Sequence, residues 1–391
     1  MDIILPQVDL ARAMKFAHRA SDTKSPIPAL ACIHLRASKE RLYVEGSDLY
    51  TTAGVYVDIE EPDEQGEALL PGLFADYSGM MPEGMVRLNV HGGAAPSVVM
   101  SSVAQKRRFS AQTIPAYDWP VDKMVASKAA PVAPDVTVPT RALLDALLAT
   151  LPAANDDETS ATNGMLVELK GGRLEAVSTD GHRVQIHRQD LAGYPGNFRL
   201  VTSKRNIRLL RRMLEDNASN TDASLAIGET TFCATLGNYV LMARTLPDFV
   251  QFGQVLDALE WGTRLTFKRE TFLAALDACS LECSSETVLE IQRGGALKVG
   301  AKVLGKITVV DEVTPEEATE MKWPKGTVSL NLGINPKYLR DAIGSLPEAD
   351  EDFVLCFTSP VEPILVTRTN TDFAGRPASA MHLAIVMPTK L

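Results

Sequence analysis

The segment RLYVEGSD at residues 41–48 has a close copy, RLEAVSTD, at residues 173–180. A weaker copy, ALKVGAKV, lies at residues 296–303. Each segment alternates as a hairpin strand does, and the copies recur at a period of about 130 residues. A period this long predicts three domains of one fold rather than a solenoid of short repeats.

Each copy is accompanied by two predicted helices and a closing strand. Amphipathic helical patterns lie at residues 8–21, 72–80, 140–151, 203–215, 269–281 and 335–345. Strands that end in an aliphatic residue and proline follow at TIP (113–115), TLP (245–247) and VMP (386–388). We therefore expect an α+β fold of three repeated domains, each an antiparallel sheet with two helices on one face.

Two segments separate the repeats. Residues 124–134, MVASKAAPVAP, are small, contain proline and lack periodicity, which is typical of a linker. Residues 251–262 form a less clear boundary, because 255–259 could be a helical turn. Three such domains can build an arc, and two arcs can close a ring. We place the domains at residues 1–125, 134–252 and 262–391.

The 391-residue chain is 45% hydrophobic, which allows three cores of ordinary size. No run approaches the roughly 18 apolar residues of a membrane span, and the start MDIILPQVDL lacks the regions of a signal peptide. Cys279 and Cys283 are too few for a metal site, so we expect them to pack in the core, with no metal bound. We also expect no cofactor, no membrane partner and a cytoplasmic location. The scattered cysteines, which fit a reduced protein, are Cys32, Cys233, Cys279, Cys283 and Cys356.

The net charge of −10 argues against a nucleic-acid partner until its distribution is considered. Acidic residues concentrate in the expected loops at 60–64, 156–158, 311–320 and 348–352. Basic residues gather instead on the predicted helices at 8–21 and 203–215. An acidic exterior with locally basic helices suits a protein that surrounds a polyanion. Charge alone leaves open that these helices are simply solvated surfaces.

Five segments of this chain resemble one family. They are LARAMKFAHRASDTKSPIPAL (10–30), RFSAQTIPAYDWP (108–120), STDGHRV (178–184), RTLPDF (244–249) and VMPTKL (386–391). In this order they are similar to the bacterial DNA polymerase III beta subunit, the replicative sliding clamp. The resemblance covers the whole chain and implies a head-to-tail homodimer, each chain being half of a six-domain ring. It also implies a non-catalytic processivity subunit of a DNA-directed DNA polymerase, loaded by an ATP-driven clamp loader.

The resemblance implies sequence-independent contacts to duplex DNA from helices that line the ring. Weak phosphate contacts suffice, because a closed ring cannot leave DNA sideways. The helix at 72–80 has no lysine or arginine, so its lining role depends on the repeat alone. We expect Arg205, Arg208 and Arg212 to be solvated. The candidate DNA-binding residues are Arg12, Lys15, Arg19, Lys24, Lys204, Arg205, Arg208, Arg211 and Arg212.

The resemblance further implies a hydrophobic pocket for short extended peptides, typically with a Gln and a Leu/Phe pair. Such peptides belong to the polymerase III alpha subunit, the clamp loader and repair polymerases. Three departures leave the peptide preference open: Thr162 for a common Leu, Val250-Gln251-Phe252 for a common Arg-Val step, and Thr389-Lys390 for Met-Arg. The pocket residues carried over by position are Thr162, Thr179, Gly181, His182, Arg183, Val184, Pro247, Phe252, Ile385, Val386, Met387, Pro388 and Leu391.

The ends of a three-domain arc leave sheet edges that invite association. We expect a first-domain strand near residues 106–111 to pair with the helix and strand around residues 280–290 of a second copy. The interface residues are then Lys106, Phe109, Ala111, Ser280 and Leu281.

Other interpretations remain open at this point. Asp180 and His182 could suggest an enzyme, although no GxSxG, P-loop, HExxH or GxGxxG motif supports one. His182 could also be a buried histidine or a zinc ligand, but His187 would point to the opposite face of the same strand. A divergent second clamp, for repair or inhibitor resistance, is not separable from a replicative one by sequence.

Overall fold

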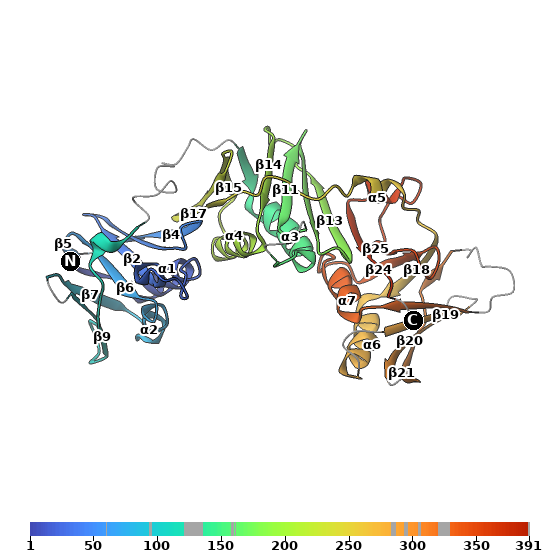
Figure 1. Ribbon diagram of the computed structural model, residues 1–391, viewed down its shortest axis with the longest axis horizontal. Coiled ribbons are helices and arrows are strands. Elements are labelled where there is room, and N and C mark those ends of the chain that lie inside the picture. Colours follow the sequence, from blue (N-terminus) through green and yellow to red (C-terminus); the bar gives the residue numbers. More distant parts are fainter. Residues whose placement is uncertain are drawn as a thin grey trace. The chain divides into compact units, whose positions relative to one another are not determined.

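The chain folds into two compact units. The computed structural model describes residues 1–59, 61–93, 96–120, 136–157, 160, 162–282, 287–292, 296–303, 306–319 and 329–389. The first unit contains Met1–Arg141 and Arg205–Thr245, and the second contains Ala142–Lys204 and Leu246–Leu391 (Figure 1). The predicted linker at 124–134 lies entirely within the stretch 121–135, outside the described residues.

The first unit holds two antiparallel sheets. The 8-stranded sheet has the order β10 (Val136–Pro139), β15 (Asp222–Ile227), β16 (Thr231–Leu236), β17 (Tyr239–Arg244), β4 (Thr51–Asp58), β3 (Arg41–Ser47), β2 (Cys32–Ala37) and β6 (Gly66–Pro71). The 5-stranded sheet has the order β5 (Glu61–Glu64), β1 (Asp2–Pro6), β7 (Met85–His91), β8 (Ser97–Ser102) and β9 (Arg108–Gln112). Its helices are α1 (Gln7–His18), α2 (Phe74–Met80) and all but the first residue of α4 (Lys204–Asp216).

The second unit is built in the same way. Its 9-stranded sheet has the order β14 (Phe198–Thr202), β11 (Met165–Lys170), β12 (Arg173–Thr179), β13 (Arg183–Asp190), β26 (His382–Val386), β25 (Ile364–Arg368), β24 (Asp352–Phe357), β18 (Thr263–Lys268) and β22 (Glu317–Ala318). Its 4-stranded sheet has the order β21 (Lys306–Val313), β20 (Leu297–Val303), β19 (Thr287–Gln292) and β23 (Ser329–Ile334). Its helices are most of α3 (Thr140–Thr150), α5 (Gly253–Asp257), α6 (Arg269–Glu282) and α7 (Pro336–Gly344).

One sheet in each unit continues from one predicted domain into the next. In the first unit β17 pairs with β4, with Ala243 opposite Thr51, and we call this pair the first junction. In the second unit β26 pairs with β13, with Val386 opposite Arg183, and we call this pair the second junction. Because both sheets are continuous, each compact unit contains one junction, and the middle predicted domain is divided between the units.

The helix pattern of the sequence is confirmed. On α1, Leu10, Met14 and Ala17 are fully buried at i, i+4 and i+7, whereas Val8 is half exposed. The helix lies on the 8-stranded sheet beside α2, and in the second unit α6 lies beside α7 (Figure 1). α7 begins with Pro336, and the Asn335 side chain caps it by accepting a hydrogen bond from the Lys337 N–H.

The expected antiparallel sheets with helices against them are also confirmed, and the possible turn at 255–259 is part of α5 and the residues after it. Cys279 is fully buried in the core of the last predicted domain, as expected from its packing role. Cys283 lies outside the described residues. Within the described part of the chain, no helix is both long and apolar enough to cross a bilayer, and no cluster of three metal-ligating side chains occurs.

Candidate nucleic-acid and peptide interfaces

The exposed face of α1 carries three of the predicted cations. Arg12 and Lys15 of α1, and Arg19 directly after it, are exposed because Leu10 and Met14 take the buried face of the helix. The Lys15 side chain lies against Gly79 of α2. It is so close that a Cβ added at Gly79 would be 2.8 Å from the Lys15 Nζ. α2 itself has no lysine or arginine, and Lys15 therefore supplies a positive charge over that helix.

The cations of α4 belong to the same unit. Arg208 and Arg212 are exposed, and the Arg212 guanidinium forms an ion pair with Asp216 at 2.7 Å. Burial raises the pKa of Tyr239 to about 12, Asp216 adds to this, and the charges of Arg12 and Arg212 oppose it. Arg12 of α1 and Arg212 of α4 therefore both lie near Tyr239. Arg211 pairs with Glu215 at 3.2 Å.

Two of the predicted DNA-binding side chains also make intramolecular contacts. The Lys204 side chain is 14% exposed, and its Nζ donates to the Ala154 carbonyl at 2.6 Å. Arg205 forms an ion pair with Asp48, and its Nη2 donates to the Ala20 carbonyl at 3.1 Å. Burial lowers the pKa of the Arg205 guanidinium. The Arg205 side chain is 42% exposed, so it is partly solvated as expected, but its charge also joins α4 to the turn after β3. Lys24 is exposed.

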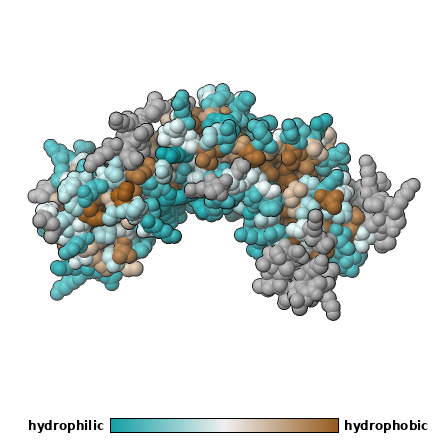
Figure 2. All heavy atoms as spheres, viewed as in Figure 1, coloured by the Kyte–Doolittle hydropathy of each residue, from teal (hydrophilic) through white to brown (hydrophobic). Residues whose placement is uncertain are grey.

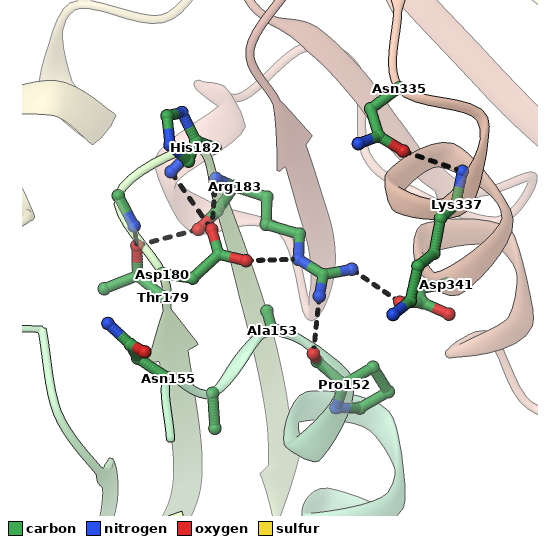
Figure 3. Close-up of polar contacts among 12 residues, drawn as sticks. Pro152, Ala153, Asn155, Thr179, Asp180, His182, Arg183, Asn335, Lys337 and Asp341 are labelled. Atoms are coloured by element: carbon green, nitrogen blue, oxygen red, sulfur yellow. Dashed lines mark hydrogen bonds and ion pairs between the residues drawn. The ribbon is translucent and has the colours of Figure 1, made fainter. Parts of the chain in front are cut away.

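The predicted peptide residues around the TDGHR motif form a tight turn between β12 and β13. The Thr179 hydroxyl donates to the Arg183 carbonyl at 2.7 Å. One Asp180 carboxylate oxygen accepts the His182 and Arg183 N–H groups at 3.0 and 3.2 Å (Figure 3). Gly181 has a φ of 90°, which glycine adopts without strain. The turn leaves the His182 side chain exposed, so the alternative of a buried histidine is wrong.

The two faces of β13 separate the predicted pocket residues into two groups. Val184 packs against an apolar cluster that includes Ile385 of β26 and Phe252. Arg183 points to the opposite face, is 7% exposed and donates to Asp341 of α7 at 2.6 Å (Figure 3). Val386, opposite Arg183, is 1% exposed within the core of the last predicted domain. Arg183 and Val386 are therefore not exposed walls of a pocket, contrary to the sequence-based prediction.

The apolar cluster beside β13 and β26 is the surface best suited to an apolar partner. Its partly buried residues are the ones that a partner can reach. Among them, Phe252 packs edge-on against buried Phe249, with ring centroids 5.9 Å apart. Figure 2 shows hydrophobic residues gathered on the drawn face of the second unit, over the region of β13, β25 and α5. Pro247 and Met387 are exposed, and the Met387 N–H donates to the His182 carbonyl at 2.9 Å. The partly buried members are Val184, Leu246, Val250, Phe252, Leu259, Phe373 and Ala378.

Sequence reasoning missed several of these residues. Leu246 lies inside the TLP motif, and its N–H donates to the Val201 carbonyl at 2.7 Å. Leu259 and Phe373 had no motif to identify them. Thr162 is half-buried, and its hydroxyl oxygen accepts a hydrogen bond from the Asn155 amide at 2.9 Å. Pro388 and Thr389 are half-buried, whereas Lys390 and Leu391 lie outside the described residues.

The predicted dimer strand is a sheet edge. β9 has β8 as its only neighbour in the 5-stranded sheet of the described chain. Phe109 stacks on Tyr77 of α2 with ring centroids 4.4 Å apart, Ala111 is half-buried and Lys106 is exposed. The predicted partner strand near 280–290 is wrong, because β19 already pairs with β20 and β23. In the described residues β21 and β23 are the two edges of that sheet, and β21 is the one beside β20. Ser280 and Leu281 end α6, and their side chains lie outside the described part.

The turn does not have the arrangement of a catalytic acid–base pair. Asp180 uses one carboxylate oxygen for the turn amides and the other for the Arg183 guanidinium at 2.9 Å. The His182 ring lies instead against Tyr338, with ring centroids 6.3 Å apart. The Asp180 carboxylate is thus engaged in holding the turn.

Repeated α+β domains, sheets continuous across the junctions and a cationic helix pair define the class of DNA clamps. Family models match the chain at residues 1–124, as the N-terminal domain of DNA polymerase III beta subunit, and at residues 137–248, as its central domain. The chain belongs to the DNA polymerase III beta subunit family, the sliding clamps of bacterial DNA replication. It is a non-catalytic processivity factor, and the comparisons favour neither an enzyme nor a specialised second clamp.

Relatives and solved structures cover the chain from end to end. The beta sliding clamp of Streptomyces coelicolor is 30% identical over 98% of this chain and 97% of its own. That of Proteus mirabilis is 23% identical over the full length of both. The DNA polymerase III beta subunit of Thermotoga maritima has a TM-score of 0.82 at 20% identity, covering 100% of this chain and 99% of its own. A Pseudomonas aeruginosa sliding clamp bound to griselimycin has a TM-score of 0.83 at 21% identity, covering 100% of both chains.

Proposed function

We propose that two copies of this chain, each with clamp domains at 1–125, 134–252 and 262–391, close a ring around duplex DNA. The observation that supports this most directly is the pair of cationic helices, α1 and α4, in one unit. Their exposed side chains, such as Arg12 and Arg208, suit phosphate contacts that carry no sequence information. The whole chain has a net charge of −10, so the surface outside these basic helices disfavours DNA binding. The ring acts in the cytoplasm, on the DNA of the nucleoid.

The head-to-tail dimer is supported by two complementary sheet edges. The edge strand β9 begins with Arg108, and Lys106 and Arg107 directly precede it. All three are exposed cations. The edge strand β21 carries exposed Asp311 and Glu312. Antiparallel addition of β9 of one chain to β21 of the other would satisfy both edges and set opposite charges together.

The partner site is the apolar surface at the second junction. Val184, Phe252 and Met387 suit the Leu/Phe pair of a short extended peptide, because buried apolar area supplies most of the affinity of such peptides. Peptides of this kind on the polymerase III alpha subunit, the clamp loader and repair polymerases are the proposed partners. The Thr162 hydroxyl accepts a hydrogen bond from Asn155, so a subsite commonly lined by Leu is polar here.

Topological retention on DNA tests the proposed function. The protein is loaded on a nicked circular plasmid by a clamp loader and then followed as the plasmid is linearised. A ring stays on the circle at high salt and leaves rapidly from the linear form, whereas a simple DNA binder leaves both at the same salt-dependent rate. Light scattering at micromolar concentration should give about twice the chain mass of 42.3 kDa. A monomer, or equal release from both DNA forms, overturns the ring.

A further inference from the structure

A buried arginine joins the two sides of the second junction at the turn before β13. The Arg183 side chain is 7% exposed, and its Nε donates to Asp180 at 2.9 Å. One terminal nitrogen donates to Asp341 of α7 at 2.6 Å, and the other donates to the Pro152 carbonyl at 2.7 Å (Figure 3). The guanidinium also lies over the Tyr338 ring, 4.3 Å from its centroid. Asp180 and Pro152 precede β13, whereas Tyr338 and Asp341 belong to α7.

Gln185, two residues further along the same face of β13, repeats this bridge. Its amide nitrogen donates to the Asp341 carbonyl at 3.1 Å. Its amide oxygen accepts the Ala153 N–H at 3.1 Å. Val184 lies between them on the other face, in the apolar cluster. The polar bridge to α7 is therefore behind the surface that a peptide would cover.

We propose that Arg183 is a positioning residue of the peptide site, which holds the turn at 179–182 against α7 and is not itself touched by the peptide. This inference rests on the proposed peptide function of the second junction. The turn also holds the segment after β26, because the His182 carbonyl accepts the Met387 N–H at 2.9 Å. A site fixed in advance loses less conformational freedom on binding, and so binds a given peptide more tightly.

The geometry requires arginine. A planar guanidinium presents donors in three directions at once, which matches two carboxylates and a carbonyl, and it stacks on Tyr338. Lysine has one ammonium group on a flexible stem and can reach only part of this set. Arg183→Lys should therefore restore little of the peptide affinity that Arg183→Met loses.

Arg188 is the matched control on the same strand. Its side chain is 10% exposed and pairs with Glu175. Its Nη1 donates to the carbonyls of Ala378 and Ala380, at 2.8 Å each. Arg188 thus also bridges the second junction with a buried guanidinium, but at the other end of β13 from the turn. Arg188→Met removes comparable contacts without releasing residues 179–182.

Calorimetric titration of the full-length protein with a Gln-x-x-Leu-Phe peptide tests the role. We expect Arg183→Met to weaken binding about tenfold and Arg188→Met to weaken it less than about threefold. Hydrogen exchange of the Met387 amide should accelerate only in Arg183→Met. Should Arg183→Met fail to fold, Asp341→Asn, which keeps the side-chain volume, should weaken binding and accelerate the same amide.

The outcomes separate this role from the peptide function itself. If the unaltered protein binds no such peptide at the second junction, the proposed site and the role of Arg183 both fail. If it binds, and the Arg183 and Arg188 variants weaken binding equally, only the positioning role fails. Undiminished affinity in Arg183→Met, or in Asp341→Asn, also overturns it.

Discussion

Leu49 and Gly181 occupy the same position of two matching hairpin turns, and both have a positive φ, 77° for Leu49 and 90° for Gly181. The turns follow RLYVEGSD and RLEAVSTD, and in each the aspartate carboxylate accepts backbone N–H groups of the turn. Among the described residues Leu49 is the only non-glycine with such a φ. Its side chain packs against the cluster that contains Leu30 and Trp119, which compensates the strain.

Substitution of Leu49 separates backbone strain from side-chain packing. Leu49→Ala keeps the unfavourable φ and loses the contacts, so the free energy of unfolding should fall by about 2 kcal/mol. Leu49→Gly loses the same contacts but relieves the strain, and should be about 1 kcal/mol more stable than the alanine variant. Urea unfolding of both variants measures the difference. Equal stability of the two would show that the turn relaxes around alanine.

Gly181→Ala is the control for the second turn. A Cβ at Gly181 meets no atom within 4 Å, so only the φ of 90° opposes it. The variant should lose about 1 kcal/mol of stability, with no contribution from a clash. A much larger loss in the same urea assay would mean that the Cβ disturbs the turn by another route.

Arg205 and Arg208, one turn apart on α4, should respond differently to alanine. Arg205→Ala leaves one oxygen of the Asp48 carboxylate, whose side chain is 10% exposed, without its cation, and should cost about 2 kcal/mol of stability. Arg208→Ala, at an exposed position, should change stability by less than about 0.5 kcal/mol but weaken retention on DNA in low salt. Thermal unfolding and plasmid-retention assays give both quantities. Loss of stability in Arg208→Ala instead would assign it a structural role.

The proposed dimer edge is testable by charge exchange. Arg108→Glu on β9 should weaken the dimer, because it would face Asp311 and Glu312 of the second chain. Adding Asp311→Lys and Glu312→Lys should restore association, since opposite charges then face each other again. Sedimentation at low and high salt measures the dimer fraction. If the variant with all three substitutions does not recover the dimer, the interface lies elsewhere.

The sequence predicted local structure well and long-range partners poorly. The spacing of Leu10 and Met14 located α1, whereas His182 was expected on a strand with His187 and lies in the turn before β13. The roles of Arg183 and Val386 were not predictable, because the face each takes depends on the pairing of β13 with β26 and on α7 behind them. Arg205 has a cationic pattern typical of a solvated helix, yet its partner Asp48 lies on a hairpin far away in the chain.

Histidine burial at the second junction predicts acid sensitivity. Burial, then the charges of His187 and Arg368, lowers the pKa of His382 to about 3. Burial also lowers the pKa of His187. The charge of Asp145 raises this pKa, and the charge of Arg368 lowers it further. Unfolded histidine titrates near pH 6.5, so between about pH 6.5 and 3 the unfolded chain binds more protons than the folded one. The free energy of unfolding should therefore fall with pH in this window, by up to about 1.4 kcal/mol per pH unit for His382.

Removal of the titrating group tests this assignment. His382→Gln can still bond to Ser345, the partner of the His382 Nε2 at 3.1 Å, and should flatten the pH dependence of stability between pH 7 and 5. His91→Gln, at an exposed position on β7, should leave it unchanged. Urea midpoints at several pH values provide the comparison. An unaltered slope in His382→Gln would assign the acid sensitivity to other groups.

Phe252 and Val386 distinguish the peptide surface from the core beneath it. Phe252 is partly exposed on the apolar cluster, so Phe252→Ala should weaken binding of a Gln-x-x-Leu-Phe peptide by about 1–2 kcal/mol, roughly tenfold, and change stability little. Val386→Ala, at 1% exposure in the last-domain core, should lower the unfolding free energy by about 2 kcal/mol and leave peptide affinity within about twofold. Titration calorimetry and urea unfolding of both variants check the contrast. If Phe252→Ala binds the peptide as the unaltered chain does, the partner docks on a different surface.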